Sequence, residues 1–227
     1  MLSLRASPAL RGSVRSIPQR NIRMNSFLSS VFGSQEKKGC EIAPKQAPNG
    51  YKLATVAGGC FWGLELAYQR VPGVISTSVG YTAGADKAPN YDSVCSGRTG
   101  HAEAVQSVYD PKEVSYEQLL DVFFEKVDPT TLNQQGNDRG TQYRSGIWYH
   151  DEEQKQIATK KVEEMNAKIA AGTSRRYQGS KVVFPVEPAV DYFVAEDYHQ
   201  QYLSKGGRGG NAQSAAKGNT DKIRCYG

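Results

Sequence analysis

Long hydrophobic runs and paired cysteines are both missing from this 227-residue sequence. No stretch approaches the about 18 consecutive apolar residues of a membrane-spanning helix, so we expect no transmembrane segment. The four cysteines, Cys40, Cys60, Cys95 and Cys225, form no Cys-x-x-Cys pair and have no histidine at a metal-ligand spacing. This pattern argues against a zinc site and leaves each cysteine as a buried structural residue or a reactive thiol.

Acidic residues are absent from residues 1–35, which hold five arginines, no lysine and many serines. Such an N-terminus is typical of an organelle transit peptide, and it lacks the apolar core of a secretory signal. We predict a transit peptide there and favour the mitochondrion slightly over the chloroplast, because the arginines are spaced along a weakly amphipathic stretch. A start at Met24 would give a cytosolic form, and the alternative is a disordered basic tail. An organelle matrix is reducing, so we expect no static disulfide framework.

The net charge of +5 comes from this N-terminal segment alone. Of the 28 Lys and Arg residues, 23 lie in residues 36–227, where 23 Asp and Glu residues balance them. A body of zero net charge gives no electrostatic reason to bind nucleic acid. The whole chain has 38% hydrophobic residues, an ordinary share for a soluble globular protein, and its length allows one domain with tails.

Turn residues and hydrophobic periodicity divide the chain into a linker over residues 36–50, a folded domain over residues 51–205 and a coil tail over residues 206–227. Strands are predicted at residues 52–57, 74–81, 101–109, 143–149 and 182–186. Helices are predicted at residues 60–71, 115–127, 151–171 and 196–203. This irregular alternation predicts an α+β fold with helices packed on one face of a mixed sheet.

Cys60 follows Gly58 and Gly59 where the first predicted strand ends and the first predicted helix begins. Glycines allow a tight turn there, and the free N–H groups at a helix start stabilise a thiolate. The aromatic pair Phe61 and Trp62 comes next, which suits a pocket for an apolar substrate. Cys60 is therefore a candidate nucleophile, and the alternative is a small buried hydrophobic residue.

The other three cysteines stand in different surroundings. Cys95 follows a loop and lacks a predicted helix start, so a structural role is favoured. Cys40 lies in the linker without supporting context. Cys225 stands near the end of a Gly-rich tail, from which it could reach and resolve an oxidised cysteine. Its alternative is an incidental terminal thiol.

Two polar residues, His101 and Glu103, open the strand predicted at residues 101–109. A Cys–His pair would suggest acyl transfer of the protease kind, and the sequence leaves that role of His101 open. Glu103 is the odder residue, because its side chain would face inward beside Val105. A buried carboxyl group has a raised pKa and holds a proton at neutral pH, whereas a solvated strand face is the alternative.

A dense polar segment, residues 137–145, carries Asp138 and Tyr143 towards the next predicted strand. A long polar loop in a compact domain is more often functional than idle. We therefore include this loop among the candidate parts of a site.

The segment Gly59-Cys60-Phe61-Trp62-Gly63 resembles the signature of the A-type peptide methionine sulfoxide reductases. The resemblance continues, in order, over roughly residues 51–205. It includes residues 79–81, 91, 94–97, 99–105, 136–145 and 195–203. The last five residues of the chain, 223–227, resemble the plant and algal members.

The resemblance implies a ferredoxin-like two-layer α/β sandwich and reduction of the S epimer of methionine sulfoxide, protein-bound or free, to methionine. The Cys60 thiolate would attack the substrate sulfur, Phe61 and Trp62 would cage its methyl group, and methionine would leave a sulfenic acid on Cys60. A second cysteine would condense with that acid, and thioredoxin would reduce the disulfide, so that oxidised proteins are repaired. No metal or organic cofactor is implied, and we expect a monomer with no nucleic-acid or membrane partner.

The resemblance also assigns an oxygen site. Glu103 would be the protonated acid that protonates the sulfoxide oxygen, Tyr91 and Tyr143 would share that oxygen, and Asp138 would support the hydrogen-bond network. These roles agree with the residues themselves, because sulfoxide reduction needs a reactive thiol, an acid for the leaving oxygen and an apolar pocket.

One departure concerns the resolving cysteine. Plant-like members often carry a further cysteine several residues before the last one, but residues 217–220 contain none. A two-step relay between tail cysteines is therefore doubtful, and we expect Cys225 to resolve Cys60 directly, with Cys40 as a weaker alternative.

Two other functions compete with this hypothesis. A cysteine hydrolase using Cys60 and a histidine would leave the aromatic pair, Glu103 and the tail cysteine unexplained. A non-catalytic module that binds oxidised methionine would tolerate loss of Cys60, and the tail cysteine argues against it.

Overall fold

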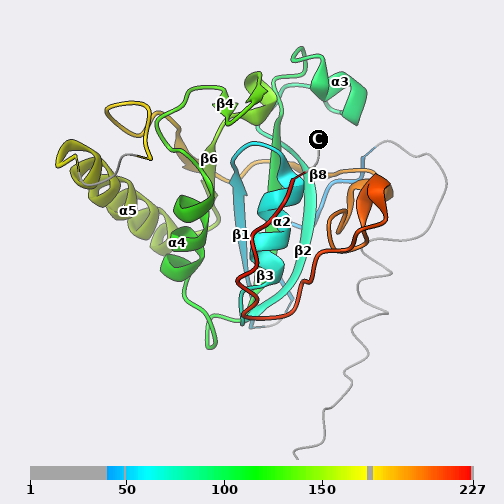
Figure 1. The fold of residues 1–227 in the computed structure, drawn as a ribbon, viewed down its shortest axis with the longest axis horizontal. Coiled ribbons are helices and arrows are strands. Elements are labelled where there is room, and N and C mark those ends of the chain that lie inside the picture. Colours follow the sequence, from blue (N-terminus) through cyan, green and yellow to red (C-terminus); the bar gives the residue numbers. More distant parts are fainter. Residues whose placement is uncertain (1–39, 49, 173–175, 226–227) are drawn as a thin grey trace, which may run out of the picture. The chain divides into compact units, whose positions relative to one another are not determined.

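The computed structural model describes residues 40–48, 50–172 and 176–225 (Figure 1). The predicted transit peptide over residues 1–35 lies outside the described residues. No helix in the described ranges is long and apolar enough to cross a membrane.

Six strands form one mixed sheet in the order β7-β6-β1-β3-β2-β8. Their bounds are β1 (Lys52–Ala57), β2 (Val74–Thr82), β3 (Ala102–Tyr109), β6 (Gly146–Tyr149), β7 (Val186–Pro188) and β8 (Tyr192–Val194). All neighbouring strands pair antiparallel except β6 and β7, which pair parallel. A separate hairpin joins β4 (Gln134–Gln135) to β5 (Asp138–Arg139).

Three helices lie on one face of this sheet, α2 (Phe61–Gln69), α4 (Tyr116–Lys126) and α5 (Glu152–Ala170) (Figure 1). Helix α2 packs against β2 and β3, α4 against β1, and α5 against α4, β6 and β7. The main hydrophobic core fills the space between helices and sheet, with Val56, Val105, Leu119 and Phe123 fully buried in it. The fold is thus α+β with a mixed sheet, as the order of predicted elements indicates.

Helix starts follow local capping chemistry. The Ser115 side chain accepts a hydrogen bond from the backbone N–H of Gln118, and the Gln118 side chain accepts one from the backbone N–H of Ser115. This arrangement confirms the capping box predicted for α4. The same device, built from Asn90 and Ser93, begins the short helix α3 (Tyr91–Cys95), which the periodicity of the sequence does not reveal because it spans one turn.

Three predicted elements are wrong in part. Of the strand predicted at residues 143–149, only β6 is a strand, because Tyr143 belongs to a 3-10 turn in which its N–H bonds to the Gly140 carbonyl. Of the strand predicted at residues 182–186, only Val186 lies in a strand, because the preceding residues cross to the loop after α4, where the Val183 N–H bonds to the Pro129 carbonyl. The helix predicted at residues 196–203 is a 3-10 turn, η2 (Asp197–His199), followed by irregular turns. Tertiary contacts override helix propensity there, since the Gln200 side chain bonds to both backbone groups of Val79.

The segments on either side of the domain are held against it. In the linker, Ile42 pairs with Phe193 of β8, and Ala43 is buried. The tail, drawn in red in Figure 1, runs back along α2. Residues 41–43 therefore extend the sheet edge, and the tail brings Cys225 to the end of α2 where the helix begins.

Candidate active site

Cys60 stands where β1 gives way to α2, as the N-cap residue of the helix. Gly59 adopts a left-handed conformation with φ of 77°, and a Cβ on it would lie 2.6 Å from the Gln135 side chain. A Cβ on Gly58 would lie 2.3 Å from the Val127 side chain. Both glycines are therefore required for this turn, which places Cys60 at the start of α2.

The tail cysteine meets Cys60 directly. The sulfur atoms of Cys60 and Cys225 lie 3.7 Å apart, although 165 positions separate the two residues in the sequence. All four cysteines of the chain are free thiols. A disulfide between Cys60 and Cys225 would need the sulfurs to approach to about 2.05 Å, a short movement for an exposed residue at the end of a coil.

The two thiols titrate as a pair. The hydrogen bond with Cys225 raises the pKa of Cys60, burial raises that pKa further, and the backbone N–H of Trp62 lowers it. The same hydrogen bond lowers the pKa of Cys225. The helix start favours a Cys60 thiolate, as the sequence predicts, and the contact with Cys225 opposes it.

Glu103 is buried in β3 with 2% of its surface exposed. Its Oε2 atom accepts a hydrogen bond of 3.2 Å from the backbone N–H of Phe61, the first residue of α2. Burial raises the pKa of Glu103 to about 8, outweighing that hydrogen bond, and the charge of Asp138 raises it as well. At neutral pH this carboxyl group therefore keeps a proton that it can donate.

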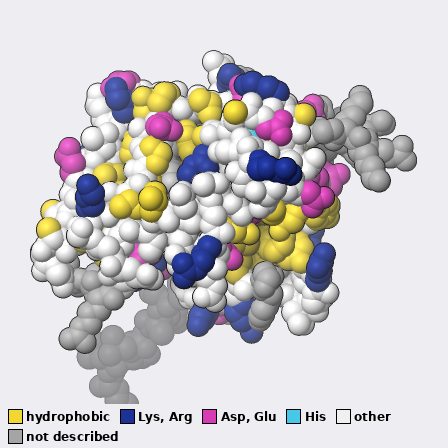
Figure 2. Space-filling view, turned by 90° about the horizontal axis from the view of Figure 1, so that it is seen from above, with side chains coloured by type: hydrophobic (Ala, Val, Ile, Leu, Met, Phe, Trp, Pro, Cys, Tyr) yellow, Lys and Arg dark blue, Asp and Glu magenta, His cyan; other side chains and the backbone are white. Residues whose placement is uncertain are grey.

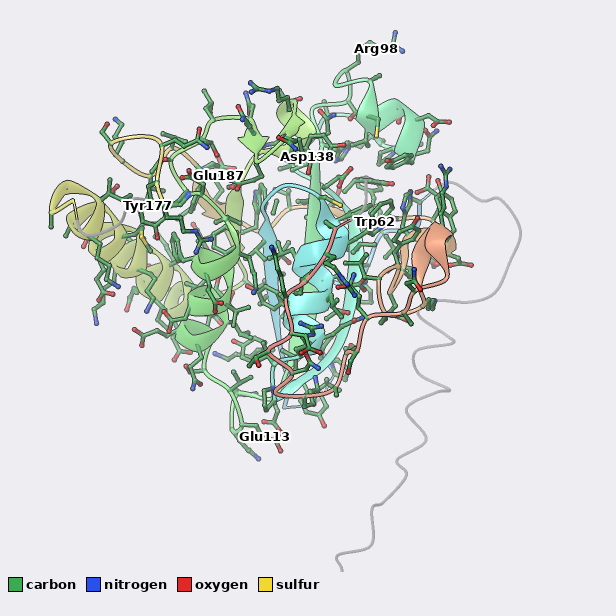
Figure 3. The ribbon with its side chains drawn as sticks, in the orientation of Figure 1. Trp62, Arg98, Glu113, Asp138, Tyr177 and Glu187 are labelled. Atoms are coloured by element: carbon green, nitrogen blue, oxygen red, sulfur yellow. The ribbon has the colours of Figure 1, made fainter. Side chains whose placement is uncertain are left out.

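Tyr91, Tyr143 and Asp138 come from three separate elements near Glu103. Tyr91 begins α3 and Tyr143 ends the 3-10 helix η1 (Thr141–Tyr143), and burial followed by nearby ionisable groups, Glu103 among them, raises the pKa of each phenol. Both phenols therefore stay protonated and able to donate. Asp138 lies in β5, above the start of α2 in Figure 3.

Aromatic side chains surround the start of α2. Phe61 is fully buried, and its ring lies 6.1 Å from that of Trp62, centroid to centroid. Trp62 is only partly buried and stacks on Tyr202 at 3.8 Å with an angle of 12° between the planes. Trp62, labelled in Figure 3, is thus a rigid apolar surface beside Cys60. Figure 2 shows this end of the molecule from above, where hydrophobic side chains gather between charged ones.

Two residues that support the site, Glu196 and His199, are given no role by the sequence prediction, although they lie in residues 195–203, which carry the family resemblance. Glu196 accepts hydrogen bonds from the Tyr81 hydroxyl at 2.8 Å and from the backbone N–H of Tyr91 at 2.9 Å. His199 lies between Phe61 and Tyr91, with centroid distances of 5.3 and 4.4 Å, and burial lowers its pKa to about 4. Both residues are far in sequence from the residues that they contact, so only the fold shows that they lie next to Phe61 and Tyr91.

The remaining candidates lie apart from the Cys60–Cys225 pair. His101 directs its Nε2 atom to the Asp86 carbonyl at 2.8 Å, so it serves the loop before α3 and is not paired with Cys60. A hydrolase would therefore lack this histidine as its base. Cys95 ends α3, four residues after Tyr91, and burial raises its pKa. Cys40 is half-buried, and burial followed by the charge of Glu196 raises its pKa to about 12, which leaves it a weak nucleophile.

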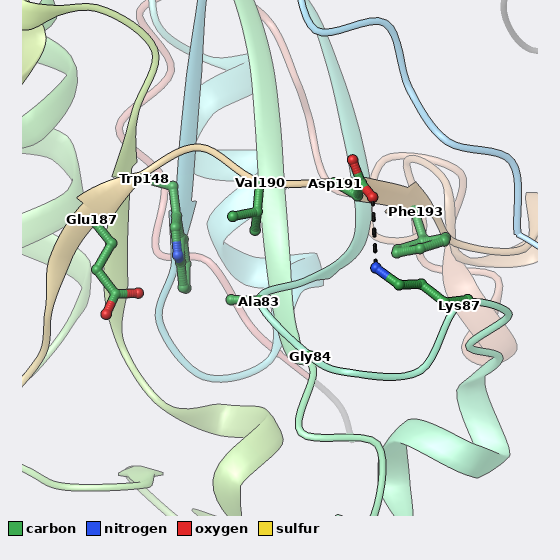
Figure 4. A pocket seen from close by; sticks show the side chains of 8 residues that line it. All are labelled: Ala83, Gly84, Lys87, Trp148, Glu187, Val190, Asp191 and Phe193. Carbon is green, nitrogen blue, oxygen red and sulfur yellow. Dashed lines mark ion pairs between the residues drawn. The ribbon is translucent and has the colours of Figure 1, made fainter.

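A separate pocket of about 350 Å3 contains none of the predicted site residues (Figure 4). It is lined by Ala83, Gly84, Lys87, Trp148, Glu187, Val190, Asp191 and Phe193. Trp148 pairs with Thr55 of β1, one position away from the core residue Val56, so its side chain lies on the opposite face of the sheet from the main core. No group of three metal-ligating side chains is found among residues 40–48, 50–172 and 176–225.

The site thus joins two contacting thiols, a buried carboxyl group that retains its proton and an aromatic surface at the start of one helix. This combination defines the protein as a thiol-dependent oxidoreductase.

Comparison with known proteins identifies the family. A model of the family described as "Peptide methionine sulfoxide reductase" matches residues 52–225. The chain is 47% identical to a peptide methionine sulfoxide reductase of Brassica napus, over 100% of this chain and 89% of that protein. It is 53% identical to the peptide methionine sulfoxide reductase A4, chloroplastic, of Arabidopsis thaliana, over 90% of this chain and 80% of that protein. The chain belongs to the peptide methionine sulfoxide reductase family.

Solved structures agree with this assignment. The methionine sulfoxide reductase A of Corynebacterium diphtheriae is 38% identical with a TM-score of 0.64, over 72% of this chain and 78% of that chain. The reduced form of Mxr1 from Saccharomyces cerevisiae is 37% identical with a TM-score of 0.63, over 73% and 90%. The chain is thus an oxidoreductase that acts on methionine sulfoxide.

Proposed function

We propose that this protein reduces the S epimer of methionine sulfoxide, in proteins and as the free amino acid, through a Cys60 sulfenic acid and a Cys60–Cys225 disulfide. One observation carries the proposal: the two sulfurs lie 3.7 Å apart. The acid needed for the chemistry lies close to Cys60, because the Glu103 carboxyl group accepts a hydrogen bond from the backbone N–H of Phe61, the next residue in the chain.

In the first step, the Cys60 thiolate attacks the sulfoxide sulfur while Glu103 gives its proton to the sulfoxide oxygen. The oxygen then transfers as a hydroxyl group from the substrate sulfur to the Cys60 sulfur, while the bond between the two sulfurs breaks. Methionine leaves with the two electrons that Cys60 gives up, and Cys60 is left as a sulfenic acid. The raised pKa of Glu103, about 8, supports this role because a carboxyl group ionised at neutral pH has no proton to give.

Three further residues are proposed to serve the oxygen. Tyr91 and Tyr143 donate hydrogen bonds to it, and Asp138 orders the surrounding network. Support comes from the raised pKa of both phenols, which burial causes and to which Glu103 contributes.

The substrate methyl group is proposed to lie against Phe61 and Trp62. Stacking on Tyr202 holds the Trp62 ring in one orientation, and a fixed methyl surface opposite a fixed oxygen site admits only one arrangement around the chiral sulfur. This geometry supports a preference for the S epimer, and separate reductases for the two epimers are the general rule.

Resolution then falls to Cys225. Its sulfur attacks the sulfenic sulfur of Cys60, the hydroxyl group leaves as water with the thiol proton, and a disulfide remains. Thioredoxin is the proposed reductant, because it acts on disulfides by thiol exchange. Cys225 is exposed and is therefore the sulfur that such a partner can reach.

The proposal extends to architecture and location. We assign residues 51–205 to the catalytic domain and residues 206–227 to a tail that carries the resolving thiol, in a protein that acts as a monomer. The central order β6-β1-β3-β2, with α2 and α4 on one face, supports the ferredoxin-like description. The chloroplastic relative from Arabidopsis thaliana supports an organelle as the destination of a leader over residues 1–35.

The test counts methionine released per enzyme from methionine sulfoxide, first without reductant and then with thioredoxin. Cys60→Ser should release none. Cys225→Ser should release about one equivalent, since sulfenic acid formation needs only the first thiol, and should then stall with thioredoxin but run with dithiothreitol. The cysteine control Cys40→Ser should behave as wild type, and Cys95→Ser should too, apart from any packing loss beside Tyr91. Undiminished thioredoxin-driven turnover of Cys225→Ser would remove the tail from the mechanism and direct attention to Cys40 or Cys95.

A further inference from the structure

The tail does not hang freely beside α2. We call residues 213–225 the C-terminal segment. Arg70, the C-cap residue of α2, is buried and donates from Nε to the Ser214 carbonyl at 2.8 Å and from Nη1 to the Asp221 carbonyl at 2.6 Å. Its own carbonyl accepts the Gly218 N–H at 2.7 Å. One side chain thus fixes two points of the segment, seven residues apart.

A second clamp lies next to Cys225. The buried side chain of Gln213 donates to the Arg224 carbonyl at 2.6 Å and accepts from the Arg224 N–H at 2.9 Å. The backbone of Gln213 is itself fixed, because its N–H bonds to the Leu203 carbonyl at 2.9 Å. The Gln213 side chain therefore bonds to both backbone groups of Arg224, the residue before Cys225.

The surface of α2 is shaped to receive this thiol. Gly63 faces it, and a Cβ added to Gly63 would lie 3.1 Å from the sulfur of Cys225, closer than an ordinary contact. Because the helix is narrow at this position, the segment approaches closely enough to bring the two sulfurs together.

We infer that Arg70 and Gln213 are positioning residues for the resolving step: they hold the C-terminal segment on α2 so that Cys225 is already beside Cys60 when the sulfenic acid forms. This inference rests on the proposed function. In the step concerned, the Cys60–oxygen bond breaks, the sulfur–sulfur bond forms, and the Cys225 proton leaves with the hydroxyl group as water. The sulfenic sulfur is the oxidant and the Cys225 thiol the reductant, so no other reactant is needed.

Holding the C-terminal segment on α2 should speed disulfide formation, because Cys225 on a free tail would meet Cys60 only by diffusion. A thiol on a flexible linker has an effective concentration in the millimolar range, whereas groups held in contact and correctly oriented react as if far more concentrated. The two clamps therefore set the rate of disulfide formation and leave the preceding reduction of the sulfoxide untouched. That separation is what an experiment can detect.

The experiment follows one turnover of the full-length reduced enzyme with methionine sulfoxide and no added reductant. Methionine release reports the reductase step. Samples quenched with dimedone, which labels sulfenic acid, and with an alkylating agent report the sulfenic acid on Cys60 and the disulfide. The variants are Gln213→Ala and Arg70→Lys, which keeps the charge but not the fork that spans two carbonyls, with Lys222→Ala as an exposed control in the same segment.

We expect each clamp variant to release methionine as wild type does and to form the disulfide about 10-fold more slowly, as expected for the loss of one or two hydrogen bonds. Dimedone-labelled Cys60 should accumulate in these variants and not in Lys222→Ala. Turnover with thioredoxin should fall, and turnover with dithiothreitol should not, because the small thiol bypasses the tail.

Disulfide formation at the wild-type rate in both clamp variants would overturn the inference. So would a clamp variant that loses its methionine release, because the residue would then serve the reductase site itself. If the wild-type enzyme releases no methionine, the proposed function fails first, and the inference fails with it. These results are distinguishable because the two steps have separate readouts.

Discussion

Replacing Glu103 by glutamine should change how the stability of the protein depends on pH. The folded-state pKa of Glu103 is about 8, against an ordinary value of 4.5, chiefly because the carboxyl group is buried. A raised pKa means that the folded chain binds the proton more tightly than the unfolded chain does. The stabilisation that this provides is complete below about pH 4.5 and is lost as the pH rises through about 8.

The size of the effect follows from the shift. One pKa unit corresponds to about 1.4 kcal/mol, so the free energy of unfolding should fall by on the order of 4 kcal/mol between pH 4 and pH 9 on account of this one group. Glutamine cannot ionise, and its amide oxygen can still accept the Phe61 N–H. The difference in unfolding free energy, Glu103→Gln minus wild type, should therefore increase with pH.

Urea unfolding at pH 5, 7 and 9, with the thiols kept reduced, measures this difference. Glu163→Gln is the matched control, because Glu163 is exposed on α5 and the same chemical change there should give a nearly constant difference. A difference for Glu103→Gln that does not vary with pH would refute the reasoning, since it would mean that Glu103 is ionised as easily in the folded protein as in water. In the reductase step the same variant should be about 10²–10⁴-fold slower, because the amide keeps a hydrogen-bond donor but loses the transferable proton.

Four further predictions use other parts of the site. Cys225→Ala should lower the apparent pKa of Cys60, read from its alkylation rate against pH, because the contact that raises this pKa is removed; an unchanged profile would contradict the pairing. The R epimer should give no methionine, and equal turnover of both epimers in a coupled assay would exclude a fixed methyl surface. Gly59→Ala should lower the free energy of unfolding by about 1–3 kcal/mol in urea titrations, given its φ of 77°, and a neutral result would mean that this turn relaxes. Residues 1–35 fused to a fluorescent protein should enter an organelle, whereas a fusion that starts at Met24 should not, and diffuse cytosolic signal from both would reject the leader.

The parts of the fold that the sequence predicts best are those with local causes. The capping box at Ser115 and the helix start at Cys60 are recognisable because their residues are neighbours in the chain. Strand β8 is not recognisable, because three residues carry no period. The 3-10 turn at residues 197–199 is missed because Gln200 bonds to Val79, 121 positions away.

The candidate site divides in the same way. Cys60 and Glu103 stand out because their residue types are unusual for their predicted elements. Glu196 does not, because its partner Tyr91 lies 105 positions away. Arg70 reads as an ordinary helix-end residue, and its contact with Asp221 spans 151 positions. Candidate reactive residues can be predicted from their residue type and local sequence. Residues that position them through distant contacts can be identified only from the three-dimensional structure.

The pairing of residues 41–43 with β8 limits how far the chain can be shortened from its amino end. Ala43 donates its N–H to Tyr192, and Val194 donates its N–H to Glu41, so these residues cover the outer rim of the last strand. A strand without such a cover offers its backbone to other molecules and invites aggregation. Removing residues 41–43 would therefore expose the backbone of β8 and leave a protein prone to self-association.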